Sequence, residues 1–214
     1  MKGFFSLDGP LISFLTKFGQ LIILTVLWMV CCIPIITIGP STSAFYYGVV
    51  KTIRHDVGYP TREFFRSFKR TLKDGVIFTL LYLIWAWLAY ASVRYLSDNL
   101  SNVHIAVLVG YVVLVVFSLG LACYIFPALS RFDVKRMKLF RMALYMTFNR
   151  LPATVVLVAV SIVLVWLIIY HLPVACIFFV PGVWCFVSTF LIEPALKKFI
   201  PEPEEGQQKE WYDE

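Results

Sequence analysis

Four long stretches of the chain contain no charged side chain, and they constrain its fold more than any other feature. They are residues 18–50, 75–93, 105–129 and 151–192. A helix crosses the hydrocarbon core of a bilayer with about 20 apolar residues. In lipid, backbone polar groups are satisfied only within helices or closed barrels, and these stretches lack the short alternation of barrel strands. We therefore expect an all-α, polytopic integral membrane protein.

The composition supports a lipid environment. Charged residues make up 15% of the 214 and hydrophobic residues 60%, whereas a soluble domain carries roughly 25% charged residues. All the cysteines lie in apolar stretches, and none forms a Cys-x-x-Cys pair: Cys31, Cys32, Cys123, Cys176 and Cys185. We interpret them as small membrane-core side chains rather than metal ligands or disulfide partners.

The stretches predict about five membrane-spanning helices in one domain of residues 1–199. They are expected at residues 18–38, 75–95 and 105–127 and in the two halves of 151–192. Gly39-Pro40 is expected to close the first helix, and His171-Leu172-Pro173 to divide the last stretch. Alternatively, the first segment enters from the cytoplasm, breaks at Gly39-Pro40 and returns as a re-entrant hairpin.

Lysine and arginine are distributed unevenly between the connecting segments. Residues 51–74 hold seven and residues 129–152 hold six, whereas residues 94–104 and 171–173 together hold only Arg94. The positive-inside rule places the basic segments and the C-terminus in the cytoplasm of a plasma-membrane protein. Five crossings would then put the N-terminus outside. Residues 200–214 are strongly acidic and are expected to form a disordered cytoplasmic tail.

A basic amphipathic helix is predicted to begin near Thr61, capped by that residue with Glu63 in its first turn. At about 100° per residue, phenylalanines gather on one side and basic residues on the other. The residues of this basic Phe helix are Arg62, Phe64, Phe65, Arg66, Phe68, Lys69, Arg70 and Lys73. Such a helix can lie in the membrane interface, or it can form a surface on which a cytoplasmic partner docks.

A repeated motif indicates an internal duplication. Residues 125–132 and 192–199 both read Ile-x-Pro-Ala-Leu-x-(Arg/Lys)-Phe. The predicted unit is an amphipathic helix followed by two spans, occurring at 60–132 and 133–199. An even number of spans gives parallel halves, unlike the inverted repeats of many carriers. The alternative is that proline followed by a basic residue is simply how membrane helices end.

The chain offers little that could carry chemistry. Its histidines are scattered, and it contains no His-Glu-x-x-His, Gly-x-Ser-x-Gly or phosphate-binding glycine loop. We predict no catalytic residue, cofactor or metal site, and no nucleic-acid binding, because orientation already explains the basic residues. Candidate helix breaks, which can free carbonyls for a ligand or serve as packing kinks, are Pro34, Gly39, Pro40, Pro181 and Gly182.

Two segments carry a family resemblance. The run Cys-Cys-Ile-Pro-Ile-Ile-Thr-Ile-Gly-Pro-Ser-Thr-Ser-Ala-Phe-Tyr-Tyr at 31–47 resembles the signature of the YesL family, DUF624. The run Gly-Tyr-Pro-Thr-Arg-Glu-Phe-Phe-Arg-Ser-Phe-Lys at 58–69 is similar to its cytoplasmic segment. The resemblance implies a small membrane protein of Gram-positive bacteria, encoded beside carbohydrate ABC importers and glycan-degrading enzymes, with no established catalytic residues.

Importer permeases normally carry a Glu-Ala-Ala-x-x-x-Gly coupling loop, which this chain lacks. The resemblance therefore implies a non-catalytic accessory or regulatory subunit of an oligosaccharide ABC importer. Its expected partners are the permease subunits, the ATPase and the lipid bilayer. Two other functions remain open: an independent transporter of a small neutral solute, and a factor for assembly or export of cell-envelope polysaccharide.

Overall fold

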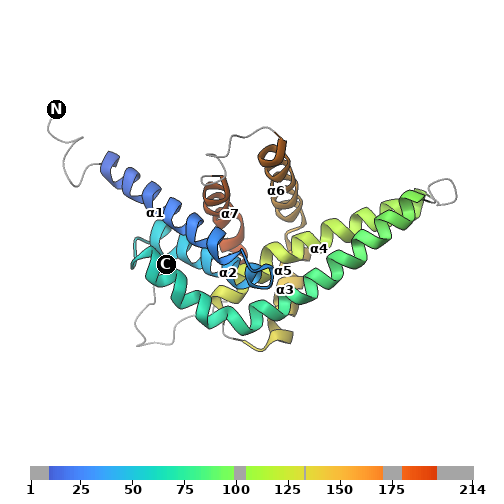
Figure 1. The fold of residues 1–214 in the computed structure, drawn as a ribbon, viewed down its shortest axis with the longest axis horizontal. Helices are drawn as coiled ribbons and strands as arrows, with labels where there is room; N and C mark the ends of the chain where they lie inside the picture. The colour runs from blue at the N-terminus through green and yellow to red at the C-terminus, as the bar shows by residue number, and fades with distance from the viewer. Residues whose placement is uncertain (1–9, 99–104, 133, 171–179, 197–214) are drawn as a thin grey trace.

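The computed structural model describes residues 10–98, 105–132, 134–170 and 180–196, and every regular element within them is a helix. The helices are α1 (Pro10–Cys31), α2 (Ile38–Gly48), α3 (Pro60–Asp98), α4 (Ile105–Arg131), α5 (Arg136–Asn149), α6 (Leu151–Tyr170) and α7 (Val180–Leu196) (Figure 1). A 3-10 turn (Ile35–Thr37) precedes α2, and a π-helical segment (Val49–Arg54) continues it. The all-α prediction is confirmed.

Three of these helices are long and apolar enough to cross a membrane: the segments Ile12–Cys31, Pro60–Leu96 and Val107–Arg131. A fourth candidate is the pair α5 and α6, which are bent by 95° where they join. Helix α7 is apolar but has only 17 residues. The described residues thus support a multi-pass membrane protein with three or four candidate spans. The predicted division at His171-Leu172-Pro173 lies outside them.

The first helix ends earlier than the sequence suggested. Helix α1 stops at Cys31 rather than at residue 38, because Pro34 has no amide hydrogen and disfavours helix in the residue before it. The hydroxyls of Thr37 and Ser41 donate to the Cys31 carbonyl at 2.6 and 3.0 Å. Gly39-Pro40 therefore does not close this helix but lies in the first turn of α2, where proline is tolerated.

Helix α2 returns along α1 in the opposite direction. Near the turn, the Trp28 ring stacks on Phe45 with centroids 5.6 Å apart, and its indole N–H donates to Thr42. At the far end, Lys17 forms a 2.8 Å ion pair with Asp56. The two ends of this segment thus lie together, in a helical hairpin that turns at 32–37 rather than at Gly39-Pro40. Re-entry of this hairpin into the membrane stays a prediction.

Helix α3 joins two elements that the sequence suggested separately, the basic Phe helix and the span at 75–95. Its 39 residues give a length of roughly 58 Å, about twice the hydrocarbon thickness of a bilayer. Figure 1 shows α3 curving, so that its first half runs beside α1 and α2 and its second half runs with α4. Only part of α3 can therefore cross a membrane.

The first half of α3 touches α2 at backbone distance. The Gly39 amide donates to the Thr79 hydroxyl at 3.0 Å. A Cβ on Gly75 would lie 2.7 Å from the Pro40 ring, and one on Gly39 would lie 2.7 Å from the Gly75 carbonyl oxygen. Small residues allow this approach, as they do between membrane helices generally.

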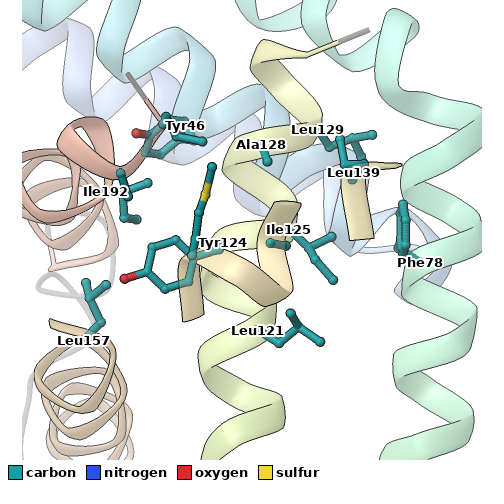
Figure 2. Close-up of a cluster of buried hydrophobic side chains, with 14 of the residues drawn as sticks. Tyr46, Phe78, Leu121, Tyr124, Ile125, Ala128, Leu129, Leu139, Leu157 and Ile192 are labelled. Atoms are coloured by element: carbon teal, nitrogen blue, oxygen red, sulfur yellow. The ribbon is translucent and has the colours of Figure 1, made fainter. Parts of the chain in front are cut away.

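The larger core cluster is centred on α4. Tyr124, Ile125 and Ala128 are almost fully buried there, between Tyr46 of α2 and Leu139 of α5 (Figure 2). A second cluster joins α1, α2 and the first half of α3. Both clusters meet on α2, so α2 is the element around which the other helices are placed.

The predicted duplication would pair α3 with α5 and α6. The two halves differ at the corresponding joint, because α3 continues through Gly75 whereas α5 and α6 bend sharply at Arg150, two residues before Pro152. The C-terminal end of the second unit and the acidic tail lie outside the described residues. The duplication stays a prediction.

Candidate functional site

A buried carboxylate ties three helices together. The Tyr46 hydroxyl of α2 donates to Oε1 of Glu193 in α7 at 2.9 Å, and Nη2 of Arg131 in α4 reaches the same oxygen at 2.6 Å. The Arg131 and Glu193 side chains are only 4% and 2% exposed. A carboxylate in such surroundings is retained only when charges and hydrogen bonds replace water. Here both partners come from other helices.

The Tyr46 hydroxyl is the donor of its hydrogen bond to Glu193, because an ionised carboxylate can only accept. The positive charge of Arg131 stabilises the same carboxylate.

A second buried ion pair lies on the π-helical segment. Lys51 Nζ is 2.8 Å from Oε2 of Glu63 in α3, and both side chains are less than 10% exposed. The same ammonium lies 5.5 Å from the centre of the Tyr47 ring, and the Arg70 guanidinium lies 5.5 Å from that ring as well. Cations near an aromatic ring are attracted by its quadrupole. Arg70 also donates to the Ser130 carbonyl.

We refer to the buried groups together as the buried polar network: Tyr46, Tyr47, Lys51, Glu63, Arg131 and Glu193. The exposed Arg70 borders it. Tyr46, Tyr47 and Lys51 belong to α2 and the π-helical segment, and π-helical turns are rare but frequent at functional sites. The network connects α2 to α3, α4 and α7. It can hold these helices in one arrangement, and it contains two carboxylates, two cations and two phenols, which are proton-exchanging and anion-binding groups.

A cavity of about 340 Å³ adjoins the network. Residues from α1, α2, α4, α6 and α7 line it, and Tyr46 belongs to both features. Its other lining residues are mostly aromatic or aliphatic, among them Trp28, Phe126 and Trp184. The site therefore combines a charged cluster with an apolar chamber.

The basic Phe helix is the first half of α3, and its apolar side is largely occupied by the chain itself. Phe64 is fully buried in the core cluster with α1 and α2, and Phe68 stacks on it with centroids 6.2 Å apart. Phe65 is 44% exposed. The basic residues Arg62, Arg66, Lys69 and Lys73 are exposed. Docking of a partner on this surface stays a prediction, now limited to Phe65 and its basic neighbours.

The candidate helix breaks do not form one site. Pro34 lies in the connection after α1, and Gly39-Pro40 packs on α3. Pro181-Gly182 does not interrupt a helix but lies in the first turn of α7, where a Cβ on Gly182 would meet Leu21 of α1 at 2.8 Å. Gly39, Pro40 and Gly182 let helices approach closely, whereas Pro34 ends α1.

The predicted site residues do not include the buried polar network. Glu193 occupies the variable position of the repeated motif, although its position directly after the uncharged stretch 151–192 is an available signal. Lys51 enters the sequence prediction only through membrane orientation, and Glu63 only as an acidic residue in the first helical turn. Among the described residues, no group of three His, Cys, Asp or Glu side chains lies close enough to hold a metal ion.

Comparisons with known proteins agree with the resemblance seen in the sequence. The family described as "Protein of unknown function, DUF624" matches residues 21–93, from the middle of α1 to near the end of α3. The "Uncharacterized protein YesL" of Bacillus subtilis (strain 168) is 25% identical over 170 residues, covering 78% of this chain and 80% of the relative. No solved structure matches. The chain is therefore similar to the DUF624 family over residues 21–93 and to YesL over most of its length.

Proposed function

We propose that the protein is a non-catalytic accessory subunit that assembles with the permease subunits of a carbohydrate ABC importer. The choice of importer rests on what the family resemblance implies. The observation that carries the role of a subunit is a two-helix arm, formed by the second half of α3 and the first half of α4. Figure 1 shows this arm running away from the rest of the molecule.

The arm holds itself together but leaves its apolar surface uncovered. The Tyr111 hydroxyl donates to the Ala89 carbonyl at 2.6 Å, and the Tyr82 hydroxyl donates to the Ser118 carbonyl at 3.2 Å. Its exposed large side chains include Leu81, Ile84, Leu88, Val93, Val109, Val112 and Val113, with Trp87 70% exposed. In lipid, van der Waals packing drives helix association, so this surface suits the helices of another subunit.

Within this proposal, the second half of α3, α4, α6 and α7 cross the membrane, and the α1–α2 hairpin enters and returns on one side. The basic segments 51–74 and 129–152 then lie in the cytoplasm of a plasma-membrane protein. Helix α7 is at the lower limit of length for a span. The start of α1 lies on the cytoplasmic side, in contrast to the outside N-terminus expected from five complete crossings.

A partner must supply the energy for transport in this assignment. The sequence has no nucleotide-binding loop and no permease coupling loop, and its apolar stretches contain no charge. Proton and ion coupling usually need an ionisable group inside the membrane. The ionisable groups of the buried polar network lie at helix ends, and their ion pairs suit a structural role.

The test is co-purification with the permease chains in mild detergent. We expect the complex to survive gel filtration, and a photo-crosslinking residue at Trp87 to join the arm to a permease chain. The same residue at Val155, which is exposed on α6, serves as the control and should react less. Reconstituted alone, the protein should accumulate no oligosaccharide, with or without a proton gradient. Concentrative uptake by the isolated protein would replace the proposal with a carrier.

A further inference from the structure

We infer that the cavity beside Tyr46 is a binding site for one alkyl chain of a lipid. Its volume of about 340 Å³ lies within the range of pockets that hold small molecules, roughly 300–1,000 Å³. Five helices contribute to its walls. It is therefore a chamber within the fold rather than an uncovered helix face.

The walls favour an apolar occupant. Trp28, Phe45, Phe126, Trp184 and Leu157 are among the lining residues, and none of the lining residues that the structure describes is charged. An unfilled apolar cavity deprives its wall atoms of dispersion contacts. Methylene groups restore these contacts without needing hydrogen bonds.

The hydroxyl groups on the lining are already used inside the protein. Thr42 donates to the Ile38 carbonyl, and Ser161 donates to the Leu157 carbonyl, both at 2.7 Å. Ser188 donates to the Cys185 carbonyl at 2.7 Å, and Tyr46 donates to Glu193. A buried water needs two to four polar partners. A sugar would leave many hydroxyls unpaired there, which is costly. The lining therefore disfavours water and carbohydrate.

The cavity is also placed to receive a chain from the bilayer. Val165 of α6 lines it and is 56% exposed, so the cavity reaches the apolar outer surface of that helix. At its inner side, the occupant would contact Tyr46 and Ile192, which adjoin the Glu193 ion pair. Lipid binding would thus support the contact between α2 and α7.

Tryptophan quenching tests this site in detergent micelles. The protein retains Trp184 alone, with the other tryptophans replaced by phenylalanine. The probes are stearic acid with a doxyl spin label and phosphatidylglycerol with the same label on one chain. We expect quenching of Trp184 to saturate at low mole fraction. The probe with the lower half-saturation identifies a free fatty acid or a phospholipid as the source of the chain.

Matched variants separate the cavity from the general surface. Ser161→Phe fills the cavity and should raise the half-saturation at least tenfold, whereas Ser92→Phe, on the exposed surface of α3, should leave it unchanged. A protein that retains only Trp87, which is exposed on the arm, should show quenching proportional to the probe concentration throughout. Adding Ser161→Phe to this protein should leave the quenching of Trp87 unchanged, which shows that the substitution acts at the cavity. Proportional, non-saturating quenching of Trp184 by both probes would overturn the inference. Because the assay contains no permease, its result is independent of the proposed function.

Discussion

At the scale of single residues, Glu193 has the largest structural consequence. One of its oxygens accepts hydrogen bonds from two other helices, in surroundings from which water is excluded. Taking two charges out of water costs several kcal/mol per ion, which the pair must recover through geometry. Replacing a whole buried pair by apolar residues of similar volume is often neutral or stabilising. Losing one partner leaves the other buried without compensation.

Replacing Glu193 with leucine should therefore be strongly destabilising. We expect a loss of about 3–5 kcal/mol, the usual cost of removing one partner from a buried ion pair. The control is Asp74→Asn, which removes the 2.5 Å pair with Arg136, whose side chains are 38% and 55% exposed. Exposed pairs contribute about 1 kcal/mol or less. Unfolding midpoints in one detergent, followed by fluorescence, should separate the variants; equal midpoints would contradict the assigned role of Glu193.

At the scale of elements, α2 determines how the helices are placed. Small residues such as Gly39, Ser43 and Ala44 are buried along it, so α1 and α3 approach it closely. The π-helical segment follows directly and places Lys51 beside Glu63 of α3, with which it forms an ion pair. Although α2 is short and only weakly amphipathic, it is thus the shared neighbour of most of the other helices.

This close packing can be tested with two glycines on long helices. Gly75→Leu should lower stability by about 1–3 kcal/mol or more, as overpacking does, because its Cβ would lie 2.7 Å from Pro40. At Gly110, a Cβ meets no atom within 4 Å. Leucine also favours helix over glycine by about 1 kcal/mol, so Gly110→Leu should be neutral or stabilising. Both thermal midpoints can be measured from the fraction of folded protein that size-exclusion chromatography recovers after heating. An equal fall in the midpoint for both variants would argue against tight α2–α3 packing.

At the scale of the whole molecule, the helices diverge from a shared base. Figure 1 shows the α3–α4 arm and the α1 end of the hairpin running to opposite sides, with α6 and α7 between them. The basic segments converge, because Arg70 bonds to the Ser130 carbonyl and Arg136 pairs with Asp74. This arrangement agrees with their placement on one side of a membrane.

Sidedness is testable with single cysteines in a protein that lacks its native thiols. In the proposed topology, the hairpin returns to the cytoplasm and the basic segments lie there. Cysteine at Lys17, Asp56, Arg66 or Arg141 should then react with an impermeant maleimide only from the cytoplasmic side. Cysteine at Ile105, which is 79% exposed, should react from outside. Reaction at Lys17 from the side opposite to Asp56 would show that α1 and α2 do not form a hairpin within the membrane.

The helical class, the membrane environment and the likeness to DUF624 can be predicted from the sequence alone. These follow from local properties, since an uncharged stretch and the signature at 31–47 are read without knowing what they touch. That α2 returns along α1, that Phe64 faces the core and that Tyr46, Arg131 and Glu193 meet cannot be predicted from local sequence. Each depends on contacts between residues distant in sequence. A residue's periodicity reveals which side of a helix it occupies, but packing decides whether lipid, water or another helix covers that side.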